Sequence, residues 1–162
     1  MSTTRKRADD SQIVRETTRG HPINMPSPED SGSRIRVILG KLRFDAHDVG
    51  ARFVMKKLVD AGMEVVFVRF ALPQELVEAA LQEDAHVIGL SALTGAHLMV
   101  CEDLMAALEQ AGLDDRLVVV GGVIADEDAD KLRALGVDGV FGSGSKPAAV
   151  VEFIREHVDP NA

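Results

Sequence analysis

One short stretch of this 162-residue chain has the side chains best suited to chemistry. It contains Asp45, then His47 two residues later, then Gly50 three residues after the histidine. An imidazole can bind a metal ion through one ring nitrogen when a hydrogen-bond acceptor holds the other nitrogen. A nearby carboxylate can be that acceptor, and it then fixes the tautomer and makes the ligand nitrogen more basic. The same spacing also arises when an aspartate caps a helix and a histidine lies on a surface loop. The stretch alone leaves both interpretations open.

The segments on either side place this stretch at the carboxyl end of a strand. The apolar run 35–39 predicts a buried strand, and residues 47–61 predict an amphipathic helix that ends at Gly62. Further strands are expected at 64–68, 87–90, 117–120 and 139–141, and further helices from Pro73, at 96–111, at 127–135 and from Pro147. We expect Phe53 on the buried face of the first helix and Leu81 on that of the second.

Five short apolar strands that alternate with five helices predict an α/β fold, with a parallel sheet covered by helices on both faces. Right-handed crossovers leave few arrangements, and we expect the flavodoxin-like (Rossmann-like) strand order 2-1-3-4-5. The domain should span residues 34–158, with a short C-terminal tail at 159–162. Residues 1–33 are polar, hold three of the six prolines and show no apolar period, so they predict a flexible N-terminal extension.

Composition argues against several classes of function. The net charge of −8 disfavours a nucleic-acid partner. No apolar run of the length needed to span a membrane is present, and no apolar segment follows the N-terminal arginines as it would in a secretory signal. The single cysteine, Cys101, has no partner for an internal disulfide, which suits a cytoplasmic protein.

In the expected strand order, the loops after strands one, three, four and five open at one edge of the sheet, where ligands bind in such folds. Small residues dominate three of these loops, at 91–95, 121–122 and 142–145. Glycines that merely turn the chain would explain any one loop, but their coincidence favours a ligand slot. No dinucleotide, Walker A or nucleophile-elbow motif is present, and Ser91 stands where a receiver domain carries its aspartate. The slot suits holding a cofactor, and no catalytic residue is expected in this chain.

Three short motifs, in this order, resemble those of cobalamin-binding domains. They are D-x-H-x-x-G at 45–50, S-x-L at 91–93 and G-G at 121–122. The resemblance covers residues 34–158. The stretches 93–97 and 141–145 look most like the small subunits, or C-terminal domains, of acyl-CoA mutases of the methylmalonyl-CoA type. Val49 departs from a frequent arginine of these proteins, and Ser-Gly-Ser at 143–145 departs from a frequent Pro-Gly-Thr.

The resemblance implies that His47 is the lower axial ligand of cobalt and that Asp45 accepts the second ring proton of this histidine. The detached nucleotide tail of the cofactor would lie in the small-residue slot. The implied cofactor-binding residues are Asp45, His47, Gly50, Ser91, Leu93, Gly121, Gly122, Gly142 and Gly144. His97 is a further candidate to contact the corrin or a partner, whereas His86 is expected to be solvated.

The implied cofactor is adenosylcobalamin, and the implied reaction is a radical 1,2-rearrangement of an acyl-CoA such as methylmalonyl-CoA or 2-hydroxyisobutyryl-CoA. The implied partners are a large subunit with an acyl-CoA-binding barrel and a G-protein chaperone for cofactor loading. Two other functions stay open: a corrinoid methyl carrier of a methyltransferase system, and a cobalamin-sensing regulatory domain. A carrier usually has a helical cap, for which residues 1–33 are short and polar, and a sensor is usually fused to an output module.

Overall fold

The computed structural model describes residues 33–92 and 95–162, and the expected alternation of strands and helices is present there. The strands are β1 (Arg36–Leu42), β2 (Glu64–Phe70), β3 (Val87–Ala92), β4 (Leu117–Gly122) and β5 (Gly139–Phe141). The helices are α1 (Val49–Asp60), α2 (Pro73–Gln82), α3 (His97–Gln110), α4 (Asp126–Ala134) and α5 (Pro147–His157). In this part of the chain, no helix is both long and apolar enough to cross a membrane. Leu93 and the extension expected at 1–33, except Ser33, lie outside the described residues.

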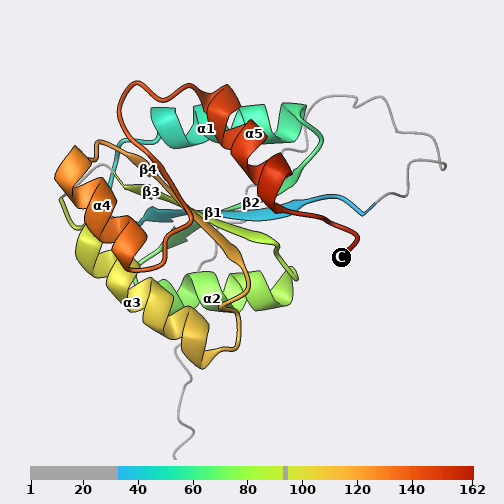
Figure 1. Cartoon of the computed structure of the whole chain (residues 1–162), viewed down its shortest axis with the longest axis horizontal. Helices are drawn as coiled ribbons and strands as arrows, with labels where there is room; N and C mark the ends of the chain where they lie inside the picture. The colour runs from blue at the N-terminus through green and yellow to red at the C-terminus, as the bar shows by residue number, and fades with distance from the viewer. Residues whose placement is uncertain (1–32, 93–94) are drawn as a thin grey trace, which may run out of the picture.

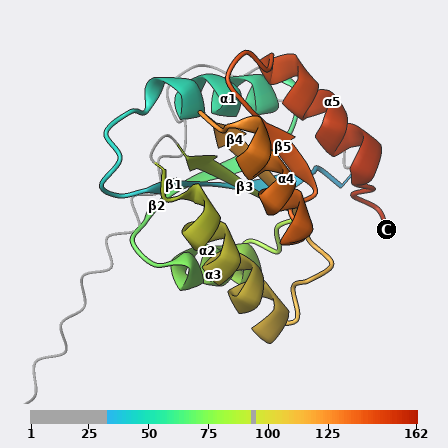
Figure 2. The ribbon, with the colours of Figure 1, turned by 60° about the vertical axis from the view of Figure 1, so that its left-hand side comes forward.

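The five strands form one parallel sheet in the order β2-β1-β3-β4-β5, which confirms the flavodoxin-like prediction. Helices α1 and α5 cover one face of the sheet, and α2, α3 and α4 cover the other (Figure 1). The same two layers of helices are visible after a turn of 60° (Figure 2). Parallel strands bring all their carboxyl ends to one edge, so the loops singled out above meet there.

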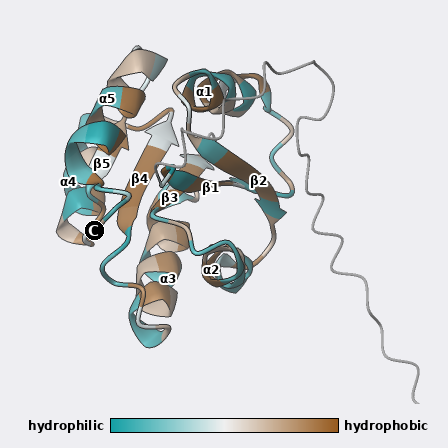
Figure 3. Cartoon of the chain, turned by 90° about the vertical axis from the view of Figure 1, so that its right-hand side faces the viewer, coloured by the Kyte–Doolittle hydropathy of each residue, from teal (hydrophilic) through white to brown (hydrophobic). Residues whose placement is uncertain are grey.

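Each face of the sheet has its own core, because successive residues of a strand point to opposite faces. In β1, Ile38 packs in the core beneath α2 and α3, whereas Val37 packs in the core shared with α1 and α5. Leu104 of α3 and Ile154 of α5 are fully buried in these two cores. The hydrophobic colours accordingly gather in the strands (Figure 3). Burial on both sides explains why the strands are apolar runs rather than alternating patterns.

Four strands reach further toward the carboxyl edge than the sequence predicted, and β3 and β4 do so by two residues each, to Ala92 and Gly122. Strand β1 ends at Leu42 instead of residue 39, and β2 ends at Phe70 instead of residue 68. The expected ends marked the limits of the apolar runs, but the ladder between β1 and β2 continues past those limits. The extra residues include Lys41 and Arg69, which face each other in the register of the two strands.

The predicted burial of two helical side chains is wrong. Phe53 and Leu81 are 52% and 53% exposed. Ala51 and Leu58 form the buried face of α1, and Phe53 lies two positions after Ala51, roughly 200° away around the helix axis. Leu81 follows the buried Leu76 by five positions, roughly 140° around α2, which turns it toward solvent.

Candidate functional site

The loop after β1 presents an exposed imidazole over a buried carboxylate. Asp45 is only 3% exposed, whereas the side chain of His47 is 75% exposed. Asp45 Oδ1 accepts the backbone N–H of His47 at 3.0 Å and lies 3.1 Å from Nδ1 of its ring. Helix α1 begins at Val49 with Asp48 at its N-cap, so Asp45 is not a helix cap. The structure therefore brings Asp45 and His47 together as the spacing suggested.

Lys41, which the sequence analysis did not single out, supports this carboxylate from the sheet. Its side chain is fully buried, and its Nζ donates to Asp45 Oδ2 at 2.9 Å. Either charge alone would be unpaired in the interior, which is strongly destabilising, so each side chain requires the other. Extending the two-residue period of β1 from Leu39 to Lys41 would have placed this lysine on the face that carries α1.

Asp45 is held in its ionised form. Burial by itself raises the pKa of this carboxyl, but the backbone N–H of His47, the Lys41 ammonium and the His47 ring outweigh burial and lower the pKa of Asp45 to about 2. An ionised carboxylate only accepts hydrogen bonds, so a neutral His47 ring that bonds to it carries its proton on Nδ1. The lone pair is then on Nε2, which makes that atom available to a metal ion.

A cavity of about 300 Å³ opens beside this loop, between the sheet and helices α1 and α5. The described site residues that it brings together are Gly50, Ser91, Gly121, Gly122, Gly142 and Gly144. Asp45 and His47 do not line the cavity, but they precede the lining residue Gly50 by five and three positions in the same loop and helix start. Most of the other lining residues are valine, leucine or isoleucine, so the cavity is mainly apolar with a few hydroxyl groups.

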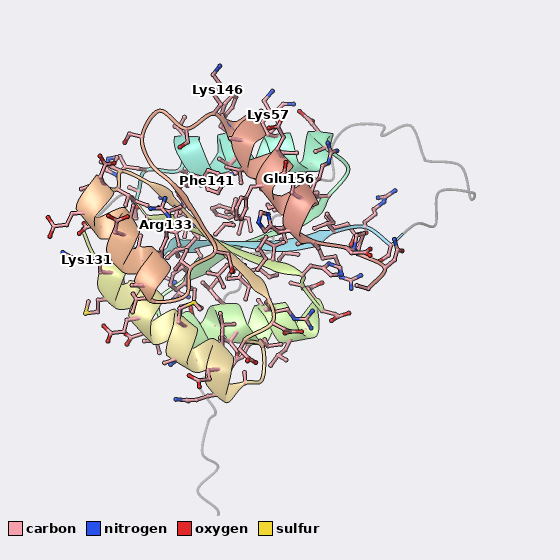
Figure 4. The ribbon with its side chains drawn as sticks, viewed as in Figure 1. Lys57, Lys131, Arg133, Phe141, Lys146 and Glu156 are labelled. Carbon is pink, nitrogen blue, oxygen red and sulfur yellow. The ribbon has the colours of Figure 1, made fainter. Side chains whose placement is uncertain are left out.

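Phe141 is a lining residue that the sequence analysis missed. Its side chain points into the space between the sheet and α5, whereas Lys57 and Lys146 point outward (Figure 4). The ring packs edge-to-face on Phe153 of α5, with 5.6 Å between centroids. This contact gives the cavity an aromatic wall on its β5 side. The sequence signal that could have identified Phe141 is its position at the end of an expected strand, just before the glycine-rich loop.

Two glycines of the site have different physical roles. A Cβ on Gly50 would meet no atom within 4 Å, so a side chain at this position would enter open space at the cavity border. A Cβ on Gly122 would lie 1.7 Å from the backbone oxygen of Ala92, and the φ of Gly122 is +145°. Gly50 therefore leaves open space at the cavity border, whereas Gly122 lets β3 and β4 approach each other closely.

Two other histidines have structural partners. His97 is buried, and its Nε2 lies 2.8 Å from Asp128 Oδ2, which links the start of α3 to α4. His86, expected to be solvated, is half-buried, and its Nδ1 accepts the backbone N–H of Arg36 at 3.0 Å. Burial lowers the pKa of His86. Neither histidine belongs to the group around Asp45.

Large apolar side chains are exposed around the same edge of the sheet. Each is more than half exposed, and they lie in the loops after β1, β2 and β4 or at the starts of α1 and α3: Phe44, Val49, Leu72, Met99 and Val123. These positions lie toward the carboxyl edge of the sheet, where ligands bind in such folds. Two of them, Phe44 and Val49, flank the loop of His47.

The B12 binding domain family matches residues 35–152 of the chain. The small subunit of 2-hydroxyisobutanoyl-CoA mutase from Aquincola tertiaricarbonis is 41% identical over 125 residues, which cover 76% of this chain and 92% of that protein. The small subunit of pivalyl-CoA mutase from Xanthobacter autotrophicus is 40% identical, with 76% and 84% covered. Methylmalonyl-CoA mutase from Cereibacter sphaeroides is 36% identical over 79% of this chain, which spans only 19% of that protein.

Solved structures share the fold at lower identity. A cobalamin-binding protein from Desulfitobacterium hafniense has a TM-score of 0.67 and 23% identity, with 78% of this chain and 60% of that chain covered. The chemotaxis protein CheY4 of Vibrio cholerae has a TM-score of 0.59 and 17% identity, with 77% and 99% covered. Since one fold hosts different functions, these structures speak for the architecture alone.

Proposed function

The chain belongs to the B12-binding domain family, and we propose that it is the cobalamin-binding small subunit of an acyl-CoA mutase, with His47 as the lower cobalt ligand. The observation that carries this proposal is the exposed His47 imidazole, held by the buried Asp45, next to a mainly apolar cavity of about 300 Å³. The family alone does not specify the ligand atom. The ionised state of Asp45 supports Nε2 as the donor to cobalt, because an ionised carboxylate favours the ring proton on Nδ1.

The described residues fit a cobalamin whose nucleotide base has left the cobalt. The cavity has the size of a small-molecule site and combines apolar walls with the hydroxyl groups of Ser91, Ser143 and Ser145. Apolar walls suit the aromatic base of the tail, and hydroxyl groups suit its sugar and phosphate. Gly50 adds space at the border, since no atom lies within 4 Å of where its Cβ would be.

Bound adenosylcobalamin would supply the radical chemistry that starts a carbon-skeleton rearrangement. The residues of this chain bind and orient. Lys41 stabilises the ionised form of Asp45, and Asp45 holds the His47 proton at Nδ1. Gly121 and Gly122 belong to the cavity wall opposite α1 and α5, where the tail would lie. No residue of this chain is assigned contact with the acyl-CoA.

The acyl-CoA site belongs, in this proposal, to a large partner subunit. Two relatives are named as small subunits of mutases, and both are matched over most of their length. The partner would cover the exposed apolar residues around the carboxyl edge, such as Phe44 and Leu72. The choice of acyl-CoA would then be made by residues of the large subunit.

The test is a titration of the purified chain with adenosylcobalamin, followed by absorbance. The wild type should give the spectrum of imidazole-ligated cobalt, and His47→Ala should lose it. His157→Ala is the matched control, since His157 is also exposed but lies on α5, where its Nδ1 contacts the oxygen of Phe153. A His47→Ala spectrum identical to that of the control would contradict the proposal.

A tagged chain, recovered from its own cells, tests the partner. Co-purification of a mutase large subunit supports the mutase assignment. Recovery of a methyltransferase instead would favour a corrinoid methyl carrier.

A further inference from the structure

We propose that Arg69 is a positioning residue that clamps the His47 loop to β2 and keeps the imidazole directed at the cofactor. The inference rests on the proposed role of His47 as cobalt ligand. Arg69 is not a lining residue of the cavity, and it would act through its contacts with residues 45 and 48.

The pairing of β1 with β2 places the two cations that contact the loop next to each other. Lys41 of β1 and Arg69 of β2 are direct partners near the carboxyl ends of their strands. Paired residues of neighbouring strands point to the same face, so two cations lie side by side beneath the loop. Lys41 binds the first carboxylate of the loop, Asp45, and Arg69 binds the second, Asp48, through Nη2 and Oδ2.

Arg69 also contacts the loop backbone. Its Nη1 lies 3.4 Å from the carbonyl oxygen of Asp45, a long and weak contact next to the ion pair with Asp48. A guanidinium can reach two acceptors at once because its donors form a rigid fork. The same side chain thus approaches the loop on both sides of His47, at the residue two before it and at the residue after it.

Hydrogen bonds within the loop carry this restraint to His47. Asp45 Oδ1 accepts the N–H of His47, and the N–H of Asp48 donates to the oxygen of Ala46 at 3.1 Å. The oxygen of Asp48 accepts the N–H of Arg52 at 2.9 Å, which joins the loop to α1. Each backbone unit has only two soft dihedral angles, so holding residues 45 and 48 leaves the backbone of residue 47 little freedom.

Shielding makes the pair matter more than an ordinary surface ion pair. The side chains of Arg69 and Asp48 are 27% and 22% exposed, so both are largely withdrawn from water. Among the described residues, Asp48 Oδ1 is buried without a hydrogen-bond partner. Arg52 makes a longer ion pair with the same oxygen, at 3.9 Å, from a more exposed side chain. Without Arg69, the carboxylate should turn to water and take the loop backbone with it.

The test uses the full chain and four variants: Arg69→Ala, Asp48→Asn, the double variant and Arg116→Ala. Arg116 is the matched control, because its side chain is 25% exposed and pairs with Asp84, away from the His47 loop. The first measurement is amide hydrogen exchange over residues 44–49 without cofactor. We expect faster exchange in Arg69→Ala and in Asp48→Asn, and wild-type exchange in Arg116→Ala.

The second measurement is the adenosylcobalamin titration. Partners that orient a metal ligand typically change affinity by roughly 10- to 100-fold, and we expect Arg69→Ala to weaken binding by about 10-fold with a smaller imidazole-ligated fraction. The double variant should bind no more weakly than Arg69→Ala, because both substitutions break one interaction. Asp48→Asn keeps the shape of the side chain and serves if Arg69→Ala does not fold.

Unchanged exchange over residues 44–49 in both single variants would overturn the clamp. Faster exchange with wild-type affinity and spectrum would overturn its role in positioning His47. A wild type that does not bind adenosylcobalamin would contradict the proposed function, while the exchange comparison would still decide whether Arg69 holds the loop.

Discussion

Lys41 and Arg69 are register partners near the carboxyl ends of β1 and β2, and each pairs with one carboxylate of the loop that carries His47. The Lys41–Asp45 pair is almost completely buried, and the Arg69–Asp48 pair is largely so. Loops are usually the mobile part of a fold, whereas strand ends are rigid. Two cations anchored in the sheet can therefore give a single exposed imidazole a defined direction.

The buried Asp45 should make stability depend on pH at the acid end. Its pKa is lowered from 3.8 to about 2 in the folded chain, so folding favours the ionised form. The stabilisation is fully present above the unfolded value and is lost as the pH falls through the folded one. The shift corresponds to about 2 kcal/mol in the free energy of unfolding, since the buried side chain is little screened by solvent. Urea unfolding at pH steps between about 6 and 2 measures it.

The control for this prediction replaces the ion pair by apolar side chains of similar size, as Lys41→Met with Asp45→Leu. Such replacements of buried pairs are often neutral or stabilising, so the double variant should fold. Its free energy of unfolding should not show the decrease at acid pH that we attribute to protonation of Asp45. Parallel pH profiles for wild type and double variant would show that Asp45 does not carry this effect.

Gly50→Leu should separate folding from cofactor binding. Gly50 is in the first turn of α1 and its Cβ would meet no atom within 4 Å, so the substitution should be tolerated. A helical glycine costs roughly 0.5–1 kcal/mol relative to alanine, and stability should stay equal or rise slightly. The leucine should occupy the cavity border and weaken adenosylcobalamin binding. Unfolding curves and titrations of the same sample test this, and undiminished affinity would place the tail elsewhere.

Gly122→Ala should destabilise the fold itself. The added Cβ would lie 1.7 Å from the backbone oxygen of Ala92, at a φ of +145°. Because that oxygen belongs to β3, relief requires movement between strands, and we expect a loss of at least about 2 kcal/mol in the free energy of unfolding. Gly121→Ala is the matched control, with its Cβ at an ordinary 3.6 Å from the oxygen of Phe141. Equal losses in the two variants would contradict the steric explanation.

Cys101 should be unreactive in the folded chain. It is fully buried in α3, and burial raises the pKa of its thiol to about 12. The thiolate is the reactive form, so a disulfide reagent at about pH 8 should modify the native chain very slowly. The same reagent should react with one thiol per chain in denaturant. Rapid reaction without denaturant would mean that α3 opens readily from the sheet.

The strand order and the edge that carries the site could be predicted from the sequence, because apolar runs, terminal glycines and the right-handed crossover rule act locally. The Asp45–His47 pair was likewise visible as a spacing. The two supporting cations were not, since a lysine or arginine at the end of an apolar run has the appearance of a loop residue. Their roles follow from strand pairing, which continues past the apolar limit of β1 and β2. The prediction that Phe53 is buried was wrong because it assigned too wide an apolar face to α1.

The most direct test of the account is whether a nitrogen of His47 is bonded to cobalt. The chain would be labelled with ¹⁵N-histidine, loaded with a cobalamin in its Co(II) state and studied by electron paramagnetic resonance. An axial ¹⁴N nucleus splits each cobalt line into a triplet, whereas ¹⁵N gives a doublet. We predict triplets from unlabelled protein and doublets from labelled protein, with the doublets absent in His47→Ala. Triplets in both samples would mean that the nucleotide base of the cofactor remains on the cobalt, and would contradict the account.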